Sequence, residues 1–306
     1  MKIVIALIFG ALILIFALSV FFLRLSLVRF GSARSRALLH EGDDSVESHA
    51  ILSERAIKLK HEKLHIEAFD RLKLCAYFFP AEKYTPKTVI CVHGYRSGGL
   101  HDHAANILYY HAKGYNVLVP DDRAHGESEG RYIGFGWLDR LDCRRWCEYL
   151  AGRFEGCELL LHGISMGSAA AICTAGERPT ALRGVIADCA YASGFEQFRH
   201  VAKSYLHIPA FPLLYTTALL IRPVCGFSLR KCSPIRALKR AKVPFLFIHG
   251  ADDRFVPTET SRRLYAACPT DKRLLIVEGA RHGECASVAP ALYYGEVEKF
   301  MRSIGF

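Results

Sequence analysis

The hydrophobic pattern of the chain begins with an uninterrupted apolar stretch from Ile3 to Leu23. These 21 residues hold no charged side chain and include only Gly10 and Ser19 as less apolar positions. As a helix, the stretch is long enough to cross about 30 Å of hydrocarbon. A cleaved signal peptide is the alternative, but the stretch exceeds a usual signal core, and Arg24 follows it in place of a small-residue cleavage site. The pattern favours a transmembrane anchor at residues 1–24.

Short apolar runs alternate with amphipathic segments over the rest of the chain. Two strands are expected at 63–69 and 72–79, and further apolar runs start near residues 88, 117, 158, 184, 243 and 273. Helices are expected at 101–113, 137–153, 165–176, 258–267 and 289–303. Such alternation predicts a mostly parallel sheet with helices on both faces. After a charged connector at 25–60, residues 61–306 suit one domain of this α/β class.

The segment between Asp188 and Val243 is too long for one connection, so residues from about 190 to 242 are expected to form an inserted lid. The segment is strongly apolar around residues 206–215, and between Gln197 and Ala251 it has nine cations and no Asp or Glu. This excess nearly accounts for the formal net charge of +10. A basic, apolar lid beside an anchor suits anionic lipid headgroups. A solvated basic face around an apolar core is an equal alternative, and no recognition motif indicates nucleic acid.

Ser165 is the candidate nucleophile. It lies in Gly-Ile-Ser-Met-Gly at residues 163–167, between an apolar run at 158–162 and a small-residue helix start. A strand, a glycine-flanked serine and a helix form the context of a nucleophile elbow. The glycines allow close approach of neighbouring backbone because they lack a Cβ. An ordinary strand-to-helix turn is the alternative.

Two later loops supply a candidate acid and a candidate base. Asp252 and Asp253 follow the apolar run at 243–248, and His282 follows the run at 273–277. The order is therefore serine, acid, histidine, with the acid and the histidine on loops just past strand ends. Other histidines have simpler explanations: His93 and His249 shape loops at strand ends, and the triplet at 101–103 begins a solvated helix.

These residues make the chain resemble the α/β-hydrolase superfamily from about residue 60 to residue 306, in particular its membrane-anchored serine esterase and lysophospholipase-like branch. The resemblance implies an α/β-hydrolase fold with Ser165 as nucleophile, Asp253 as orienting acid and His282 as general base. The family form Gly-x-x-Asp-x-x-Val-Pro selects Asp253, because Gly250 and Val256 flank it at the required spacing. Asp252 and Asp188, which ends the apolar run at 184–187, are the alternative acids.

The resemblance also implies an oxyanion hole made of two backbone N–H groups. One comes from Met166, after the nucleophile, and the other from Tyr95 in the His-Gly turn at 93–99. The segment at 121–128 resembles the family's Asp-x-Arg-Gly-His-Gly-x-Ser, with Ala124 in place of a glycine, and is interpreted as a structural brace. The glycine-rich turn lacks the ending of a phosphate loop, and zinc-ligand spacings are absent, so no cofactor or metal is expected.

Charge and cysteine use bear on the compartment. Lys2 alone precedes the apolar stretch, whereas Arg24, Arg29, Arg34 and Arg36 follow it, which favours a domain on the cytoplasmic side. The eleven cysteines are scattered without disulfide-like spacing, and no Asn-x-Ser/Thr acceptor occurs. We expect a single-pass membrane protein whose domain faces the cytoplasm.

The predicted activity is hydrolysis of carboxylic esters or thioesters of acyl or lipid-like substrates through an acyl-enzyme. A serine peptidase on the same fold is one alternative, although family peptidases usually carry a larger cap. A non-catalytic, membrane-bound binding protein on the same scaffold is another. A dehalogenase or epoxide hydrolase would need a carboxylate in place of Ser165 and is disfavoured.

Overall fold

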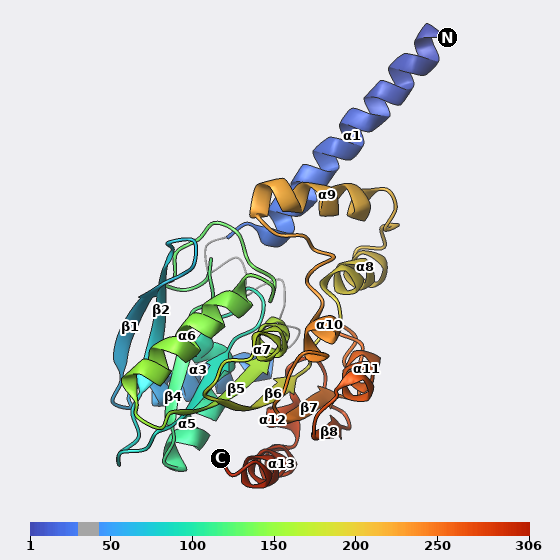
Figure 1. Ribbon diagram of the computed structural model, residues 1–306. Helices are drawn as coiled ribbons and strands as arrows, with labels where there is room; N and C mark the ends of the chain where they lie inside the picture. Colours follow the sequence, from blue (N-terminus) through green and yellow to red (C-terminus); the bar gives the residue numbers. More distant parts are fainter. Residues whose placement is uncertain (30–42) are drawn as a thin grey trace.

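An eight-stranded, mostly parallel sheet forms the centre of the computed structural model, which describes residues 1–29 and 43–306 and the side chains of 1–29 and 50–306 (Figure 1). The strand order is β1-β2-β4-β3-β5-β6-β7-β8. β1 pairs antiparallel with β2 and β2 with β4, and the pairs from β4 through β8 are parallel. The predicted mostly parallel sheet is thus confirmed. The strands are β1 (Glu62–Glu67), β2 (Lys73–Phe79), β3 (Lys87–Val92), β4 (Asn116–Pro120), β5 (Glu158–Ile164), β6 (Leu182–Asp188), β7 (Phe245–Gly250) and β8 (Lys272–Val277).

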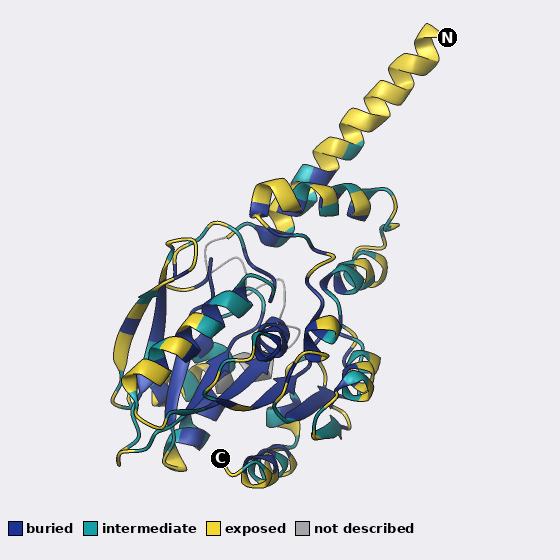
Figure 2. Cartoon of the chain, in the orientation of Figure 1, coloured by how far each residue is buried: buried dark blue, intermediate teal, exposed yellow. Residues whose placement is uncertain are grey.

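Helices cover both faces of this sheet, so its central strands are buried on both sides (Figure 2). In β3, Ile90 and Val92 enter one core while Val89 and Cys91 enter the other, as the two-residue period of a strand requires. The first core includes side chains of α6 (Asp139–Arg153), α7 (Met166–Glu177) and α11 (Glu259–Ala267). The second includes α3 (Asp43–Ile57), α5 (Ala104–Ala112), α12 (Cys285–Val288) and α13 (Pro290–Ser303).

Most predicted boundaries lie within two residues of the observed ones, and two differences among the helices have clear local reasons. The helix expected at 101–113 is divided into α4 (Gly99–Asp102) and α5, because His103 leaves the helical region with φ −107° and ψ 12°. The helix expected from Ser165 begins at Met166, since Ser165 has a positive φ. The segment predicted as a connector contains α3, whereas the part of it at 30–42 lies outside the described residues.

The predicted lid segment contains α8 (Gly194–Ser204), α9 (Leu213–Cys225) and α10 (Pro234–Leu238). α10 belongs to the body of the domain, because it packs on α7 so closely that a Cβ on Gly176 would lie 2.8 Å from the Ala237 carbonyl oxygen. α8 and α9 lie on the side from which α1 projects (Figure 1). Of this segment, α8 and α9 are thus the helices that lie apart from α7 and on the side of α1.

α1 (Lys2–Leu27) is long and apolar enough to cross a membrane, with a mean hydropathy of 3.1 over its most apolar window. Most of the helix projects away from the domain and is exposed (Figures 1 and 2). Its last turns are different, since Leu23 and Leu27 are buried against the domain. The helix thus continues past the predicted anchor boundary at residue 24 and ends inside the folded domain.

Candidate active site

Ser165 occupies a strained turn between β5 and α7, with φ 55° and ψ −113°. A positive φ is costly for a residue that carries a Cβ and persists only where the surroundings enforce it. The flanking glycines are needed for space: a Cβ on Gly163 would lie 2.4 Å from Gly167 backbone atoms, and a Cβ on Gly167 would lie 2.0 Å from the Val92 carbonyl oxygen. The turn therefore has the tight geometry expected of a nucleophile elbow.

Three side chains from distant parts of the sequence form a continuous hydrogen-bonded chain. The Ser165 hydroxyl lies 2.9 Å from His282 Nε2, and His282 Nδ1 lies 2.7 Å from Asp253 Oδ2. Asp253 follows β7 and His282 follows β8, so both come from loops at the carboxyl edge of the sheet where β5 also ends. Ser165 and Asp253 are buried, whereas His282 keeps partial access to solvent. The structure thus brings the three predicted residues within proton-transfer distance.

The loop after β7 holds Asp253 in its ionised form. Asp253 Oδ1 accepts hydrogen bonds from the Phe255 amide at 2.9 Å and the Val256 amide at 2.8 Å, and His249 Nε2 lies 3.1 Å from Oδ2. Burial alone would raise the pKa of Asp253, but the hydrogen bonds from His249 and His282 outweigh burial and lower that pKa below its ordinary value. The carboxylate is therefore charged at neutral pH, as an orienting acid requires.

The two alternative acids have different surroundings. Asp252 is exposed beside Asp253. Asp188 is buried, and its Oδ2 accepts a hydrogen bond from the Tyr293 hydroxyl at 3.0 Å. Burial raises the pKa of Asp188 to about 6, although the Tyr293 bond opposes the rise. Because His282 bonds to Asp253, the geometry favours Asp253 over both neighbours.

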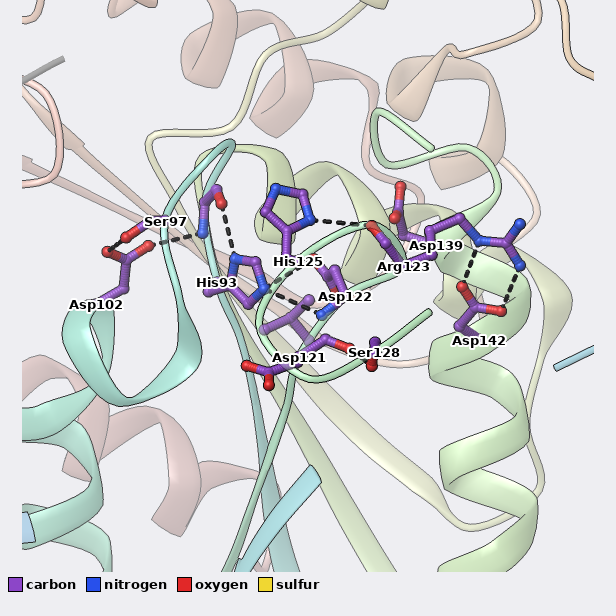
Figure 3. A network of polar contacts seen from close by, with 12 residues as sticks. His93, Ser97, Asp102, Asp121, Asp122, Arg123, His125, Ser128, Asp139 and Asp142 are labelled. Atoms are coloured by element: carbon purple, nitrogen blue, oxygen red, sulfur yellow. Dashed lines mark hydrogen bonds and ion pairs between the residues drawn. The ribbon is translucent and has the colours of Figure 1, made fainter. Parts of the chain in front are cut away.

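The loop after β3 is held on both sides of Tyr95. The Gly94 amide donates to Asp102 Oδ2 at 2.7 Å, and the Arg96 amide donates to His125 Nε2 at 3.0 Å. Asp102 and His125 approach the loop from different segments (Figure 3). Within residues 1–29 and 43–306, the Tyr95 amide between these two ties has no hydrogen-bond partner, and neither does the Met166 amide. Two backbone donors are therefore left for a ligand.

His125 can hold the loop because its ring is neutral. Burial, and then the nearby His93, lower the pKa of His125 to about 3. Its Nδ1–H then donates to the Arg123 carbonyl at 3.0 Å, which leaves Nε2 as an acceptor for the Arg96 amide. His93 uses the same arrangement: Nδ1 donates to the Gly94 carbonyl at 2.8 Å, and Nε2 accepts from an amide in the loop after β4 (Figure 3).

Arg123 connects the segment at 121–128 to the rest of the domain. Its buried guanidinium donates to Asp142 on α6 at 2.6 and 2.7 Å (Figure 3). It also donates to Asp70 at 2.9 Å. Ser128 donates to the Asp121 carbonyl at 2.6 Å within the same loop. These contacts agree with the predicted structural brace and show that His125 extends the brace to the Tyr95 loop.

The expectation of a solvated helix start at 101–103 is wrong for two of its three residues. His103 is fully buried, where its Nε2 donates to the Val92 carbonyl at 2.9 Å. Burial lowers the pKa of His103 to about 4. Asp102 accepts from the Gly94 amide and from the Ser97 hydroxyl, and although burial opposes ionisation, the His101 hydrogen bond helps to lower the pKa of Asp102. The role of Asp102 in holding the Gly94 amide has one signal in the sequence, which is the proximity of residues 101–103 to the His-Gly turn at 93–99.

An apolar cavity of about 120 Å³ reaches Ser165 and Met166. Its walls come from several segments: Tyr95 and Phe135 from loops, Phe198 and Val201 from α8, Leu213 and Leu214 from α9, and Phe22 and Ser26 from α1. The contribution of α1 is not anticipated by the sequence pattern. The cavity provides space for an apolar group next to the Ser165 hydroxyl.

Cys189, Asp253 and His282 place three ligand-type atoms within 4.8 Å of one another. Burial, and then Asp188, raise the pKa of Cys189 well above its ordinary value, so the thiol stays protonated. Both ring nitrogens of His282 are already bonded to Asp253 and Ser165. Since metal ligation needs a thiolate and a free imidazole nitrogen, these residues fit the hydrogen-bonded chain better than a metal site.

Comparisons with known proteins agree with the observed fold. The chain is 28% identical to the Bacillus subtilis protein YqkD over 281 residues, which cover 84% of this chain and 91% of that protein. It is 28% identical to human monoglyceride lipase over 257 residues, or 71% of this chain and 82% of the lipase. Its fold is similar to that of the Pyrococcus furiosus esterase Pf2001, with a TM-score of 0.67 and 23% identity over 82% of this chain and 93% of that one. The profile of the alpha/beta hydrolase family matches residues 89–296, and the chain belongs to that family.

Proposed function

We propose that this protein is a serine hydrolase that cleaves carboxylic ester or thioester bonds of acyl or lipid-like substrates. The observation that carries the proposal is the hydrogen-bonded chain from Ser165 through His282 to Asp253, with distances of 2.9 and 2.7 Å. Family membership supports hydrolytic chemistry in general. The relative named monoglyceride lipase supports an acyl ester as the substrate class.

The proposed reaction begins with proton transfer from Ser165 to His282. With its Nδ1–H donating to Asp253, His282 presents the Nε2 lone pair to the serine hydroxyl, as a general base must. The Ser165 oxygen attacks the substrate carbonyl carbon, and the imidazolium that forms is stabilised by the Asp253 carboxylate. His282 then protonates the leaving alcohol or thiol, which yields an acyl-enzyme. In the second half, His282 takes a proton from water, and the resulting attack releases the acid and restores Ser165.

The Tyr95 and Met166 amides are the proposed oxyanion donors. The negative charge that develops on the carbonyl oxygen needs donors that are already oriented. Two observations support these two amides: both lack a partner within the described residues, and the amides on each side of Tyr95 are tied to Asp102 and His125. Each donor is expected to contribute about 3 kcal/mol of transition-state stabilisation.

The cavity favours an acyl chain over a peptide. Its described lining is aromatic, aliphatic or uncharged polar and contains no Asp, Glu, Lys or Arg. A fatty-acyl group gains roughly 0.8 kcal/mol for each methylene buried there. An aminopeptidase would need an acidic side chain to hold the substrate ammonium group. Fatty-acyl p-nitrophenyl esters should therefore be turned over much faster than aminoacyl p-nitroanilides, and the reverse ranking would favour the peptidase alternative.

Labelling with a fluorophosphonate probe tests the nucleophile. The native chain and Ser287→Ala, which changes an exposed serine, should both react, whereas Ser165→Ala should not. Equal labelling of Ser165→Ala and the native chain would reject Ser165 as the nucleophile. No labelling of any of the three folded proteins would favour a non-catalytic binding protein on this scaffold.

We further propose that α1 anchors the protein as a single membrane span and that the domain faces the cytoplasm. The length and exposure of α1 support a span, and the cations that follow it support this orientation. The eleven cysteines are all free, which fits a reducing compartment. A membrane-impermeant thiol reagent applied to intact cells should spare half-buried Cys157, whereas permeabilised cells should allow its modification. Modification in intact cells would reverse the orientation.

A further inference from the structure

The membrane helix α1 and the cavity at Ser165 are in direct contact. Phe22 and Ser26, one helical turn apart on α1, line the same cavity as Ser165 and Met166. A helix that served only as a tether would end before the domain and leave the cavity to the α/β core and its lid. Here two turns of α1 form one wall of the cavity next to the reacting hydroxyl.

α1 is fixed in this position by an apolar stripe. Ser19, Leu23 and Leu27 recur every four residues, so they share one face of the helix, and all three are buried. They pack with Leu214 and Ile221 of α9 in one apolar cluster, apart from Ser19, whose hydroxyl lies 2.5 Å from Thr216 Oγ1 on α9. This contact determines which face of α1 packs on α9 and how far along α1 the two helices meet.

The position of α9 along α1 determines where the cavity lies relative to the membrane. Residues 2–18 of α1 precede the contact with α9 and extend about 25 Å at about 1.5 Å per residue. This length nearly spans a hydrocarbon layer of about 30 Å. α9 and the adjacent loop turn large apolar side chains outward at that level, since Leu219 and Phe211 are each 74% exposed. With α1 as the proposed membrane span, this places α9 and the adjacent loop at the edge of the bilayer.

α1 also holds the loop that carries the proposed oxyanion donor. The Tyr95 hydroxyl donates to the Ser26 carbonyl at 2.5 Å. The Arg96 guanidinium donates to the Leu25 carbonyl and, at 3.3 Å, to the Val28 carbonyl. The C-terminal carbonyls of a helix otherwise lack partners, so these bonds satisfy both α1 and the loop. The loop that supplies the Tyr95 amide therefore depends on α1 for its position.

We propose that the last two turns of α1 are part of the substrate site, where Phe22 and Ser26 contact the acyl chain of an ester that comes from the bilayer. This inference rests on the proposed serine hydrolase activity and specifies its substrate as a membrane-resident acyl ester. Phe22 determines the acyl length that the cavity accepts. The anchor is then a specificity element as well as an attachment.

The test compares substitutions at two neighbouring positions of α1 in the full-length chain, purified in one detergent. Phe22→Trp adds volume to the cavity wall, whereas Phe21→Trp makes the same change at a side chain that is 58% exposed. With p-nitrophenyl esters from acetate to palmitate, Phe22→Trp should lower kcat/KM for palmitate about tenfold relative to acetate. Phe21→Trp should keep the native profile. Phe22→Ala should shift the preference toward longer chains, which gives a second, opposite effect if the larger side chain impairs folding.

The outcomes separate this inference from the proposed activity. One outcome is that both Phe22 variants keep the native acyl-length profile while they cleave the acetate ester and react with a fluorophosphonate. That result would reject the role of α1 in the substrate site and would leave the proposed hydrolase activity supported. A native chain that cleaves no ester and gains no label would reject the hydrolase and, with it, this inference. A length-selective change at Phe22 and none at Phe21 would support both.

Discussion

The two sides of Ser165 are stabilised by different kinds of contact, polar on one side and apolar on the other. On one side, the Tyr95 loop is fixed by directional hydrogen bonds that its Gly94 and Arg96 amides donate to half-buried Asp102 and buried His125. On the other side, α1, α8 and α9 enclose a cavity with aromatic and aliphatic side chains. The first side determines where a carbonyl oxygen can be held, and the second determines what can be attached to it.

The difference follows from the energetics of the two kinds of contact. A buried polar group that loses its partner costs about 1–3 kcal/mol, so the polar side has one arrangement. Apolar burial depends on area more than on direction, so side chains on the apolar side can adjust to ligands of several lengths. Substitutions on the polar side should therefore change turnover of every substrate, whereas those on the apolar side should change the choice among substrates.

The largest effect is expected at the acid. Asp253→Asn removes the charge that orients His282 and stabilises its protonated form, so kcat should fall on the order of 10⁴-fold for acetate and palmitate esters alike. Asp252→Asn changes the adjacent exposed carboxyl and should stay within about twofold of the native chain. Steady-state kinetics on both esters measures this. The opposite ranking of the two variants would move the acid by one residue.

His125→Leu should have the next largest effect. The substitution removes the hydrogen bond that the Arg96 amide donates to His125, and so weakens the positioning of the Tyr95 amide, which is a proposed oxyanion donor. Loss of one such donor lowers kcat about 10²-fold, and KM should change little because the ground-state carbonyl is bound less strongly than the oxyanion. The matched control is His65→Leu at an exposed position on β1. A selective loss of long-chain substrates in place of a uniform fall in kcat would break the division between the two sides.

Leu219→Glu tests the apolar side with a smaller effect. A carboxylate at this exposed position of α9 would oppose contact with the hydrocarbon edge, so hydrolysis of a long-chain ester embedded in vesicles should fall about tenfold. Turnover of p-nitrophenyl acetate should not change, because Leu219 does not line the cavity. Leu292→Glu, on α13 and 50% exposed, is the control. Equal loss for both esters would place Leu219 in a structural role.

The sequence predicts the sheet and the three hydrogen-bonded residues for the same physical reason. Central strands must be apolar on both faces, and the elbow needs glycines at 163 and 167 for backbone clearance, so both leave local patterns. The resemblance to the family's Gly-x-x-Asp-x-x-Val-Pro form selects Asp253 over Asp252, and the bond to His282 agrees with that selection.

Contacts between segments distant in sequence leave no such pattern. In the sequence, His103 is a polar residue at a predicted helix start, yet it is buried because α5 packs against the sheet in the second core. The apolar stretch that contains Phe22 reads as a uniform membrane span, because the pattern does not show which face meets α9. The hydrogen bond between Ser19 and Thr216 joins residues in two apolar segments and becomes visible only in the folded chain.

The smallest effect on turnover is expected at Asp188, a buried acid at the end of β6 whose Oδ1 has no hydrogen-bond partner among the described residues. Because burial raises the pKa of Asp188 to about 6 from an unfolded value near 4, the native state binds more protons than the unfolded state between these pH values. The contribution of Asp188 to stability is therefore fully present below about pH 4 and is lost as the pH rises through about 6.

Asp188→Asn keeps a partner for Tyr293 and removes the ionisation, so its melting temperature relative to the native chain should rise between pH 4.5 and 7.5, with kcat within about threefold. For Asp252→Asn, measured in the same detergent, the difference in melting temperature from the native chain should stay the same between pH 4.5 and 7.5. If Asp188→Asn instead lowers kcat as much as Asp253→Asn does, the buried acid takes part in the reaction, and the site contains two functional carboxylates.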